Sequence, residues 1–334
     1  MIQFRKSDMN TKTINWGIIG VGDVCEIKSG PAYQKTDGFF LKAVMRRDFD
    51  KAKDFATRHG IEKYFSNADA LIHSPEIDAI YIATPPDTHL EYALKVAEAG
   101  KICCVEKPMA MTYQECQTMF SAFKERNLPL FVAYYRRSLP RFQQIKSWID
   151  THKIGDVRHI HWSLKKQANH IDLSKNYNWR TDKHIALGGY FDDLASHGLD
   201  FFHYILGEFD SVSGQSSNQQ NLYSAKDAIS ASWIHKNGVT GSAYWNFGSW
   251  EREDTVEIIG NKGSIKFSVF DDNPLQLINS KETISLTIAH PENIQLYHVQ
   301  AMKDHLDGLE THPSTGKTGL HTAWIMDKIL NRIS

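Results

Sequence analysis

The chain has 334 residues, a formal net charge of −1 and 41% hydrophobic residues. That length is enough for two domains with a sizeable core, and the balanced charge lacks the basic excess of a nucleic-acid-binding protein. The four cysteines match neither a disulfide framework nor a zinc site by their spacing, so we expect reduced thiols, a cytoplasmic location and no metal centre.

The segment from Met1 to Lys12 is polar and lacks the apolar stretch of a signal peptide, and Met9 is an alternative start. No apolar run approaches the length that crosses a membrane. We therefore expect a cytosolic enzyme whose partners include neither membranes nor nucleic acid.

Up to about Tyr135, short apolar runs alternate with stretches of helical pattern. This alternation predicts βαβ units and a parallel sheet in a first domain over residues 12–135. Strands are expected at residues 14–19, 39–45, 79–83, 102–105 and 130–133, and helices at 24–34, 50–59, 88–99 and 112–126.

A glycine-rich turn follows the first expected strand. Gly20 and Gly22, with Asp23 and Val24 at the start of the next helix, match the fingerprint of a dinucleotide-binding unit. The first glycine allows a tight turn, the second lets the backbone approach a pyrophosphate, and the helix start supplies amide donors. The third position is normally Gly or Ala and is Cys25 here. The alternative is an ordinary strand-to-helix turn.

The end of the second expected strand indicates the type of cofactor. An acidic residue there normally binds the ribose hydroxyls of NAD, whereas arginine accommodates the 2′-phosphate of NADP. Arg46 occupies this position and Arg47 follows, so we expect NADP, with NAD as the alternative. Asp48 is predicted to be the N-cap of a helix beginning near Asp50. Two solvated arginines in a turn are the other interpretation.

Lys107 follows the fourth expected strand, in Val105-Glu106-Lys107-Pro108. Ligands of parallel sheets bind at the carboxyl ends of the strands. Pro108 biases Lys107 away from helix, so the chain turns there. An ammonium group at that place can hold a substrate hydroxyl or pass a proton, although a solvated surface lysine would give the same tripeptide.

Residues 136–334 follow a different rhythm, which predicts a second domain with an antiparallel sheet covered by helices on one face. A helix is expected at 140–150 and a strand at 158–164, then mainly strands from 209 to 286, and helices at 293–309 and 318–333. Asn237-Gly238 predicts a two-residue hairpin turn and Asn261-Lys262-Gly263 another tight turn. Apolar residues that one covered face would not bury predict a homodimer or homotetramer, and they include Trp233, Tyr244, Trp245 and Trp250.

A polar helix is expected after Gly188-Gly189. Asp193 and His197 are four residues apart and share one helix face, which Asp200 continues. A histidine held by a carboxylate suits general acid–base chemistry. A metal-ligand pair is the alternative, but no third ligand stands at a convincing spacing. An N-cap aspartate beside a satisfied histidine is the plainest interpretation.

Together these segments resemble the Gfo/Idh/MocA family of oxidoreductases over nearly the whole chain. The motifs that carry the resemblance are the turn at Gly20, Ala83-Thr84-Pro85-Pro86 with His89, Ala99-Gly100-Lys101, Glu106-Lys107-Pro108, Ile154-Gly155-Asp156-Val157, Trp179-Arg180, Gly188-Gly189 with Asp193 and His197, and Ile259-Gly260 with Gly263-Ser264. The sequence departs from the family pattern at Cys25, at Arg46 and at Tyr190, where a third glycine is common.

The resemblance implies a Rossmann domain followed by an α/β domain, residues 136–334, with a large, open, mostly antiparallel sheet whose exposed face often serves oligomer contacts. It implies a substrate that is a sugar, a cyclic polyol or a derivative, oxidised at a secondary alcohol or reduced at the ketone. The residues that it assigns are Lys107, Asp193 and His197 for catalysis, Thr84, Pro85, His89, Glu106 and Lys107 beside the cofactor, and Trp179 and Arg180 beside the substrate.

In that chemistry a hydride passes between the substrate carbon and the nicotinamide. We expect His197 to move the alcohol proton, with Asp193 orienting it or binding a substrate hydroxyl, and Lys107 to stabilise the reacting oxygen. The roles of Lys107 and His197 are exchangeable, since a buried lysine can also act as a base. Two alternatives are a glycosidase that uses NAD for transient oxidation and a non-catalytic dinucleotide-sensing protein.

Overall fold

The computed structural model describes residues 13–333, so the segment from Met1 to Lys12, with the alternative start at Met9, lies outside the described residues. The first half forms a six-stranded parallel sheet in the order β3-β2-β1-β4-β5-β6. Its strands are β1 (Ile14–Ile19), β2 (Phe39–Met45), β3 (Lys63–Phe65), β4 (Ala79–Ile82), β5 (Ile102–Val105) and β6 (Leu130–Val132). The strand order reverses between β1 and β4, where such sheets bind ligands.

Helices pack on this sheet between the strands. They are α1 (Asp23–Ile27), α2 (Gly30–Gln34), α3 (Phe49–His59), α4 (Ala68–Ile72), α5 (His89–Glu98) and α6 (Tyr113–Glu125), with a 3₁₀ turn η1 (Pro86–Thr88) before α5. The single helix expected at 24–34 is wrong. Pro31 has no N–H to bond the Ile27 carbonyl, so the helix stops and α2 starts anew with proline in its first turn.

The second half forms an eight-stranded sheet in the order β14-β13-β12-β11-β7-β10-β9-β8, in which only β7 and β10 pair in parallel. The strands are β7 (Val157–Lys165), β8 (Phe209–Ser217), β9 (Ala228–His235), β10 (Thr240–Asn246), β11 (Glu253–Gly260), β12 (Gly263–Phe267), β13 (Leu275–Asn279) and β14 (Thr283–Leu286). The predicted mostly antiparallel sheet is confirmed.

Two turns of this sheet were expected from glycine. The tight turn at Asn261-Lys262 joins β11 to β12 as predicted. The hairpin between β9 and β10 forms, but its turn has three residues rather than two, because the His235 amide still pairs with the Val239 carbonyl at 2.8 Å. Gly238 adopts a φ of +87° in this turn, which favours glycine.

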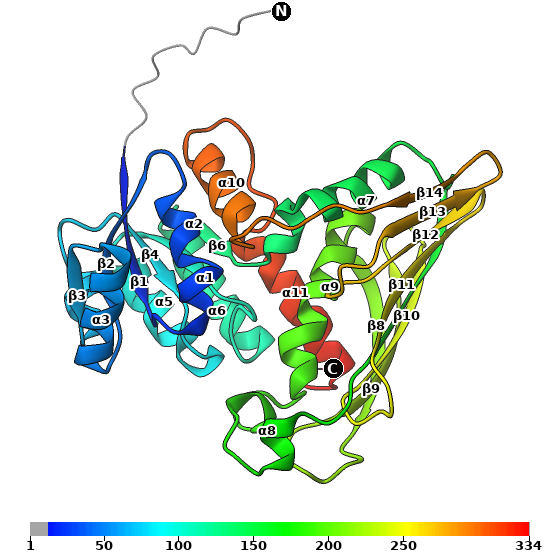
Figure 1. Cartoon of the computed structure of the whole chain (residues 1–334), viewed down its shortest axis with the longest axis horizontal. Helices are drawn as coiled ribbons and strands as arrows, with labels where there is room; N and C mark the ends of the chain where they lie inside the picture. Colours follow the sequence, from blue (N-terminus) through cyan, green and yellow to red (C-terminus); the bar gives the residue numbers. More distant parts are fainter. Residues whose placement is uncertain (1–12, 334) are drawn as a thin grey trace, which may run out of the picture.

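One face of the second sheet is covered by α7 (Pro140–Asp150), α9 (Tyr190–Leu206) and α11 (Gly316–Ile329), as Figure 1 shows. Trp233 and Trp245 are buried in this layer, so they do not belong to the unburied aromatic set that was expected. Tyr244 is partly exposed on the opposite face, and Trp250 is 88% exposed in the loop after β10.

The C-terminal helices return to the first sheet. Val299 and Met302 of α10 (Leu296–Leu306) join the core that contains Trp16 of β1, and the Ser314 hydroxyl donates to the Val132 carbonyl at 2.8 Å. Figure 1 shows α10 beside α2 and β6. We propose residues 12–135 and 136–334 as the two domains. This division separates the two sheets, although residues of α10 in the second range belong to the hydrophobic core of the first sheet. Within residues 13–333, no helix is long and apolar enough to cross a membrane.

Candidate active site

The two glycines of the turn after β1 serve different purposes. Gly20 has a φ of +95°, and a Cβ there would lie 2.9 Å from the backbone nitrogen of Thr84, so no side chain fits. A Cβ on Gly22 would meet nothing within 4 Å. Gly20 is therefore required by the fold, whereas Gly22 keeps the space above the turn open. Cys25 is fully buried behind the turn, and its sulfur lies 3.8 Å from the Gly20 carbonyl oxygen.

A pocket of about 380 Å³ adjoins this turn, which is a volume typical of ligand sites. Most of the residues expected beside the cofactor line it, namely Gly20, Gly22, Arg46, Arg47, Thr84 and Pro85. Asp23 and Val24 open α1 next to it. The Arg46 guanidinium donates to the Val21 carbonyl at 3.1 Å, and Arg47 is exposed. Asp48 accepts from the Lys51 amide at 3.1 Å, as predicted for an N-cap, although the helix begins at Phe49.

Two residues expected beside the cofactor are held inside the protein. His89 is fully buried, and its ring nitrogens lie 2.8 Å from the Thr84 carbonyl and 3.0 Å from that of Pro108. Burial lowers the pKa of this histidine. His89 therefore ties the pocket loop to the turn after Lys107 and does not itself line the pocket.

The second is Glu106, which is 8% exposed. Its carboxylate accepts from the Tyr81 hydroxyl at 2.5 Å, from the Gln295 amide at 2.7 Å and from the Lys107 backbone at 3.0 Å. These contacts fix the backbone from which the Lys107 side chain leaves β5.

Lys107 and Asp193 meet, although they come from different domains. The Lys107 ammonium donates to the Asp193 carboxylate and, at 3.0 Å, to the Asp193 carbonyl. Arg180, from the 3₁₀ turn η3 (Trp179–Thr181), donates to the other carboxylate oxygen at 2.8 Å. Burial alone would raise the pKa of Asp193, but Lys107 and Arg180 outweigh it and hold the pKa below its usual range. Asp193 is thus a carboxylate that positions Lys107.

His197 lies one turn further along α9 and is only 4% exposed. Its Nδ1 is buried without a hydrogen-bond partner among the described residues. The centroid of its ring lies 5.3 Å from that of the Tyr135 ring and 5.8 Å from that of the Phe270 ring. Burial, and then the nearby Arg136 and Lys107, hold the pKa of His197 well below its usual value, so the ring is neutral. Asp193 does not orient it as expected, since both Asp193 oxygens bind cations.

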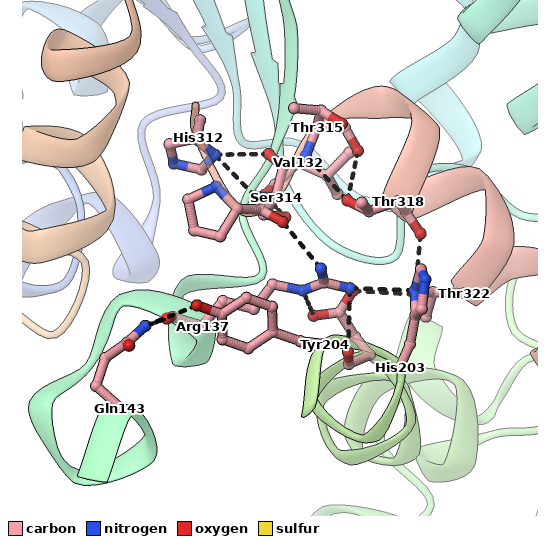
Figure 2. Close-up of polar contacts among 12 residues, drawn as sticks. Val132, Arg137, Gln143, His203, Tyr204, His312, Ser314, Thr315, Thr318 and Thr322 are labelled. Atoms are coloured by element: carbon pink, nitrogen blue, oxygen red, sulfur yellow. Dashed lines mark hydrogen bonds and ion pairs between the residues drawn. The ribbon is translucent and has the colours of Figure 1, made fainter. Parts of the chain in front are cut away.

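Asp200, the third polar residue of this helix, belongs to the support of the site. Its carboxylate pairs with Arg137 through two contacts of 2.7 Å and accepts from the Thr322 hydroxyl at 3.0 Å. The Arg137 guanidinium also donates to the Pro313 carbonyl at 2.9 Å. Figure 2 shows this network, which joins the linker turn η2 (Tyr135–Ser138) to α9 and α11 and fixes how α9 sits against the first domain.

Arg136 is a further charged residue near the site that was not among the predicted site residues. It is 7% exposed, and its guanidinium lies 4.6 Å from the centroid of the Phe270 ring. It follows β6 at the carboxyl edge of the parallel sheet, so the rule that pointed to Lys107 points to Arg136 as well. Trp179 stacks on Arg180 at 4.4 Å and lines a small cavity with Asp193.

All four cysteines are buried and unpaired. No group of three or more His, Cys, Asp or Glu residues is arranged to hold a metal ion within residues 13–333.

Comparison with known proteins places the chain. Residues 14–134 match the oxidoreductase family with an NAD-binding Rossmann fold, and residues 142–266 match the GFO/IDH/MocA C-terminal domain. The chain is 41% identical over 288 residues to oxidoreductase P35 of Formosa agariphila, covering 86% of this chain and 85% of that protein. The chain belongs to the GFO/IDH/MocA family of oxidoreductases. The expected family, fold and enzyme class are thereby confirmed.

The chain is also similar, at lower identity, to levoglucosan dehydrogenase. The enzyme from Pseudarthrobacter phenanthrenivorans is 27% identical over 332 residues, covering 87% of this chain and 85% of that protein. A solved structure of levoglucosan dehydrogenase with NADH and L-sorbose has a TM-score of 0.84 at 26% identity, covering 95% and 96% of the two chains.

The described residues fit the cofactor that this family implies. The space above Gly22 is open to an approaching phosphate, and Arg46 and Arg47 offer it positive charge. The ammonium of Lys107 provides a polar group for a substrate at the end of β5, and the unpartnered Nδ1 of His197 is buried beside it in α9.

Proposed function

We propose that this oxidoreductase transfers a hydride between a nicotinamide cofactor and a secondary alcohol or ketone of a sugar, a cyclic polyol or a derivative. The observation that carries the proposal is the contact between Lys107, at the end of β5, and Asp193 on α9. It joins the ligand-binding edge of the first sheet to the polar face of the second domain. The likeness to levoglucosan dehydrogenase supports a sugar as substrate.

The residues divide the chemistry as follows. The cofactor, when bound, supplies the hydride acceptor or donor. The Lys107 ammonium, held by Asp193, donates a hydrogen bond to the reacting oxygen and stabilises negative charge as it develops there. His197 is neutral, and a neutral imidazole can accept the alcohol proton in oxidation and return it in reduction.

The experiment that tests this function is a panel of sugars and inositols, followed by nicotinamide absorbance with either cofactor. We expect turnover of at least one sugar or polyol. Release of a glycone without net change in absorbance would indicate a glycosidase instead. Cofactor binding without turnover of any compound would leave a sensing protein.

We infer a preference for NADP over NAD, with Gly20, Gly22, Asp23, Val24, Thr84 and Pro85 holding the shared part of the cofactor. Arg46 and Arg47 line the same pocket, and their guanidinium groups suit a 2′-phosphate. Titration of both cofactors should show tighter binding of NADP, and Arg46→Ala should weaken NADP by roughly tenfold while changing NAD little. Tighter binding of NAD by the unaltered protein would defeat this inference.

We also propose that the protein forms a homodimer or homotetramer through the open face of the second sheet. Ile234, Tyr244, Ile259 and Ile278 are each at least 36% exposed on its strands. Apolar surface of this kind marks an interface. Light scattering at micromolar concentration should show more than one chain, and Tyr244→Glu should lower the observed mass. A cytoplasmic location is consistent with the four unpaired cysteines.

A further inference from the structure

A second cavity, of about 250 Å³, lies in the second domain, and the charge of Asp193 acts on Lys166, which lines it. Tyr190, which lines it, stands three residues before Asp193 on α9, so the two side chains are neighbours on one helix face. The volume is below the roughly 300–1,000 Å³ of sites that take a whole ligand. The cavity therefore suits one substituent of a substrate whose reacting carbon lies at Lys107.

Two cations face this cavity. Lys166 follows β7 and Arg252 precedes β11, and both line it together with Gln167, Asn169 and Phe247. The antiparallel register pairs Lys165 with Glu253, so Lys166 and Arg252 are the next residues across from each other. The backbone of Lys166 is fixed by bonds of 2.8 Å to the Asn246 carbonyl and 3.0 Å from the Ser249 amide.

Lys165 and Lys166 are adjacent in the sequence but differ in their ion pairs. Lys165 points to the other side of the strand and pairs with Glu253 at 2.6 Å and Glu251 at 3.1 Å. The ammonium of Lys166 has no ion pair or hydrogen bond within residues 13–333, although the residue is half-buried. Burial, and then Arg252, lower the pKa of Lys166. A ligand of opposite charge would stabilise this half-buried, unpaired cation.

The carboxylates whose negative charge raises the pKa of Lys166 already pair with other cations. They are Asp193 and Asp271. Asp193 is shared by Lys107 and Arg180, and Asp271 accepts from Arg252 at 3.1 Å. The charged residues that line the cavity are Lys166 and Arg252, and of these Arg252 is paired with Asp271, so Lys166 brings an uncompensated positive charge to the lining.

We propose that Lys166 and Arg252 form a subsite for an anionic substituent of the substrate, so that the substrate class is an acidic sugar. The side-chain amide nitrogen of Asn169 provides a further donor to an anion or its neighbouring hydroxyls, whereas that of Gln167 donates to the Trp250 carbonyl at 2.7 Å. The proposal rests on the proposed function for the place of the reacting carbon, but the binding of an anionic sugar at this subsite is measurable without turnover.

The test is calorimetric titration of the cofactor-loaded protein with matched sugars: D-glucuronate, D-galacturonate and D-glucose 6-phosphate against D-glucose and D-galactose. We expect at least one anionic sugar to bind at least tenfold more tightly than its neutral counterpart. Tighter binding of a uronate identifies a carboxylate as the recognised group, and tighter binding of the phosphate ester identifies a phosphate.

Three variants locate the effect. Lys166→Met, which keeps the length of the side chain, should reduce the anionic-to-neutral affinity ratio at least tenfold, and Lys166→Arg should retain it. Lys165→Met is the matched control one residue away and should leave the ratio unchanged. Melting curves of all three variants show whether each is folded.

The outcomes separate the two proposals. Equal binding of neutral and anionic sugars, no binding of any sugar, or an unchanged ratio in folded Lys166→Met overturns the subsite. Turnover of neutral sugars without preference overturns the subsite and leaves the proposed function standing. Preferential binding of an anionic sugar that never changes nicotinamide absorbance overturns the function and supports the subsite.

Discussion

The cofactor side of the site is built mainly from backbone, whereas the substrate side is built from charged side chains. Gly20 and Gly22 shape the pocket by having no side chain. Across from them, Lys107 and Asp193 hold each other in a partly buried ion pair, where each side chain is at most 15% exposed. A backbone turn needs no partner, but a buried charge is stable only while its partner is present. Substitutions should therefore be costlier on the substrate side.

The largest effect should come from the network that supports α9. Asp200→Ala leaves the Arg137 guanidinium buried and without its carboxylate, so the free energy of unfolding should fall by about 3–5 kcal/mol. Denaturant unfolding measures it. The control is Asp54→Ala, which removes an exposed pair with Arg58 and should cost less than about 1 kcal/mol. A similar fall in the free energy of unfolding in Asp200→Ala and Asp54→Ala would contradict the proposed difference between buried and exposed ion pairs.

Catalysis should depend next on two residues of the substrate side. Lys107→Ala and His197→Ala should each lower kcat by about a hundredfold or more, because each removes a group that stabilises charge or moves a proton. Cofactor affinity should survive in His197→Ala. Lys101→Ala, at the amino end of the same strand as Lys107, is the control and should keep full kcat. A normal kcat of Lys107→Ala or of His197→Ala in steady-state kinetics would show that the substituted residue has no part in the mechanism.

The two glycines offer a sharper test of the backbone side. Gly20→Ala forces a Cβ against Thr84 and strains a positive φ, so it should cost about 1–3 kcal/mol of stability. Gly22→Ala meets open space and should leave the melting temperature unchanged while weakening cofactor binding. Thermal unfolding and cofactor titration of both variants check this. A loss of stability in Gly22→Ala would mean that this glycine also serves the fold.

The smallest effect should appear as acid sensitivity. Burial lowers the pKa of His235 to about 4, against about 6.5 in an unfolded chain. Below pH 6.5 the unfolded chain binds the proton first, so this histidine's contribution is complete above pH 6.5 and lost at about 1.4 kcal/mol per pH unit down to pH 4. Unfolding of the unaltered protein and of His235→Gln at pH 7.5 and 5.5 measures it. An equal pH dependence in both proteins would contradict the assignment.

The first sheet was predictable where apolar runs are continuous and bounded by turn residues. The limits of β1, β2 and β5 agree with the predicted residues. The strand β3 and the helix α4 were missed, because Lys63-Tyr64-Phe65 is too short and too polar to stand out and α4 has only five residues. Their structure is imposed by packing on β2, which no local pattern reveals.

The sequence predicted which residues form the site but not which of them contact one another. The place after a parallel strand brought out Lys107, and the i, i+4 spacing brought out Asp193 and His197, since such a pair shares a helix face. It also suggested that Asp193 would hold His197, whereas cations from two other segments take both of its oxygens. Lys166 and Arg252 are brought together only by the register of β7 and β11, so tertiary structure was needed to find them.

The return of α10 to the first sheet bears on how the chain is made. Val299 and Met302 fill the core around Trp16, and Gln295 bonds Glu106 beside Lys107. During synthesis the first domain emerges from the ribosome long before these residues exist, and domains otherwise fold as units in that order. The cofactor-binding half must therefore wait with an incomplete core until residues 295–302 have been translated. A fragment that ends at residue 135 should accordingly expose apolar surface and aggregate.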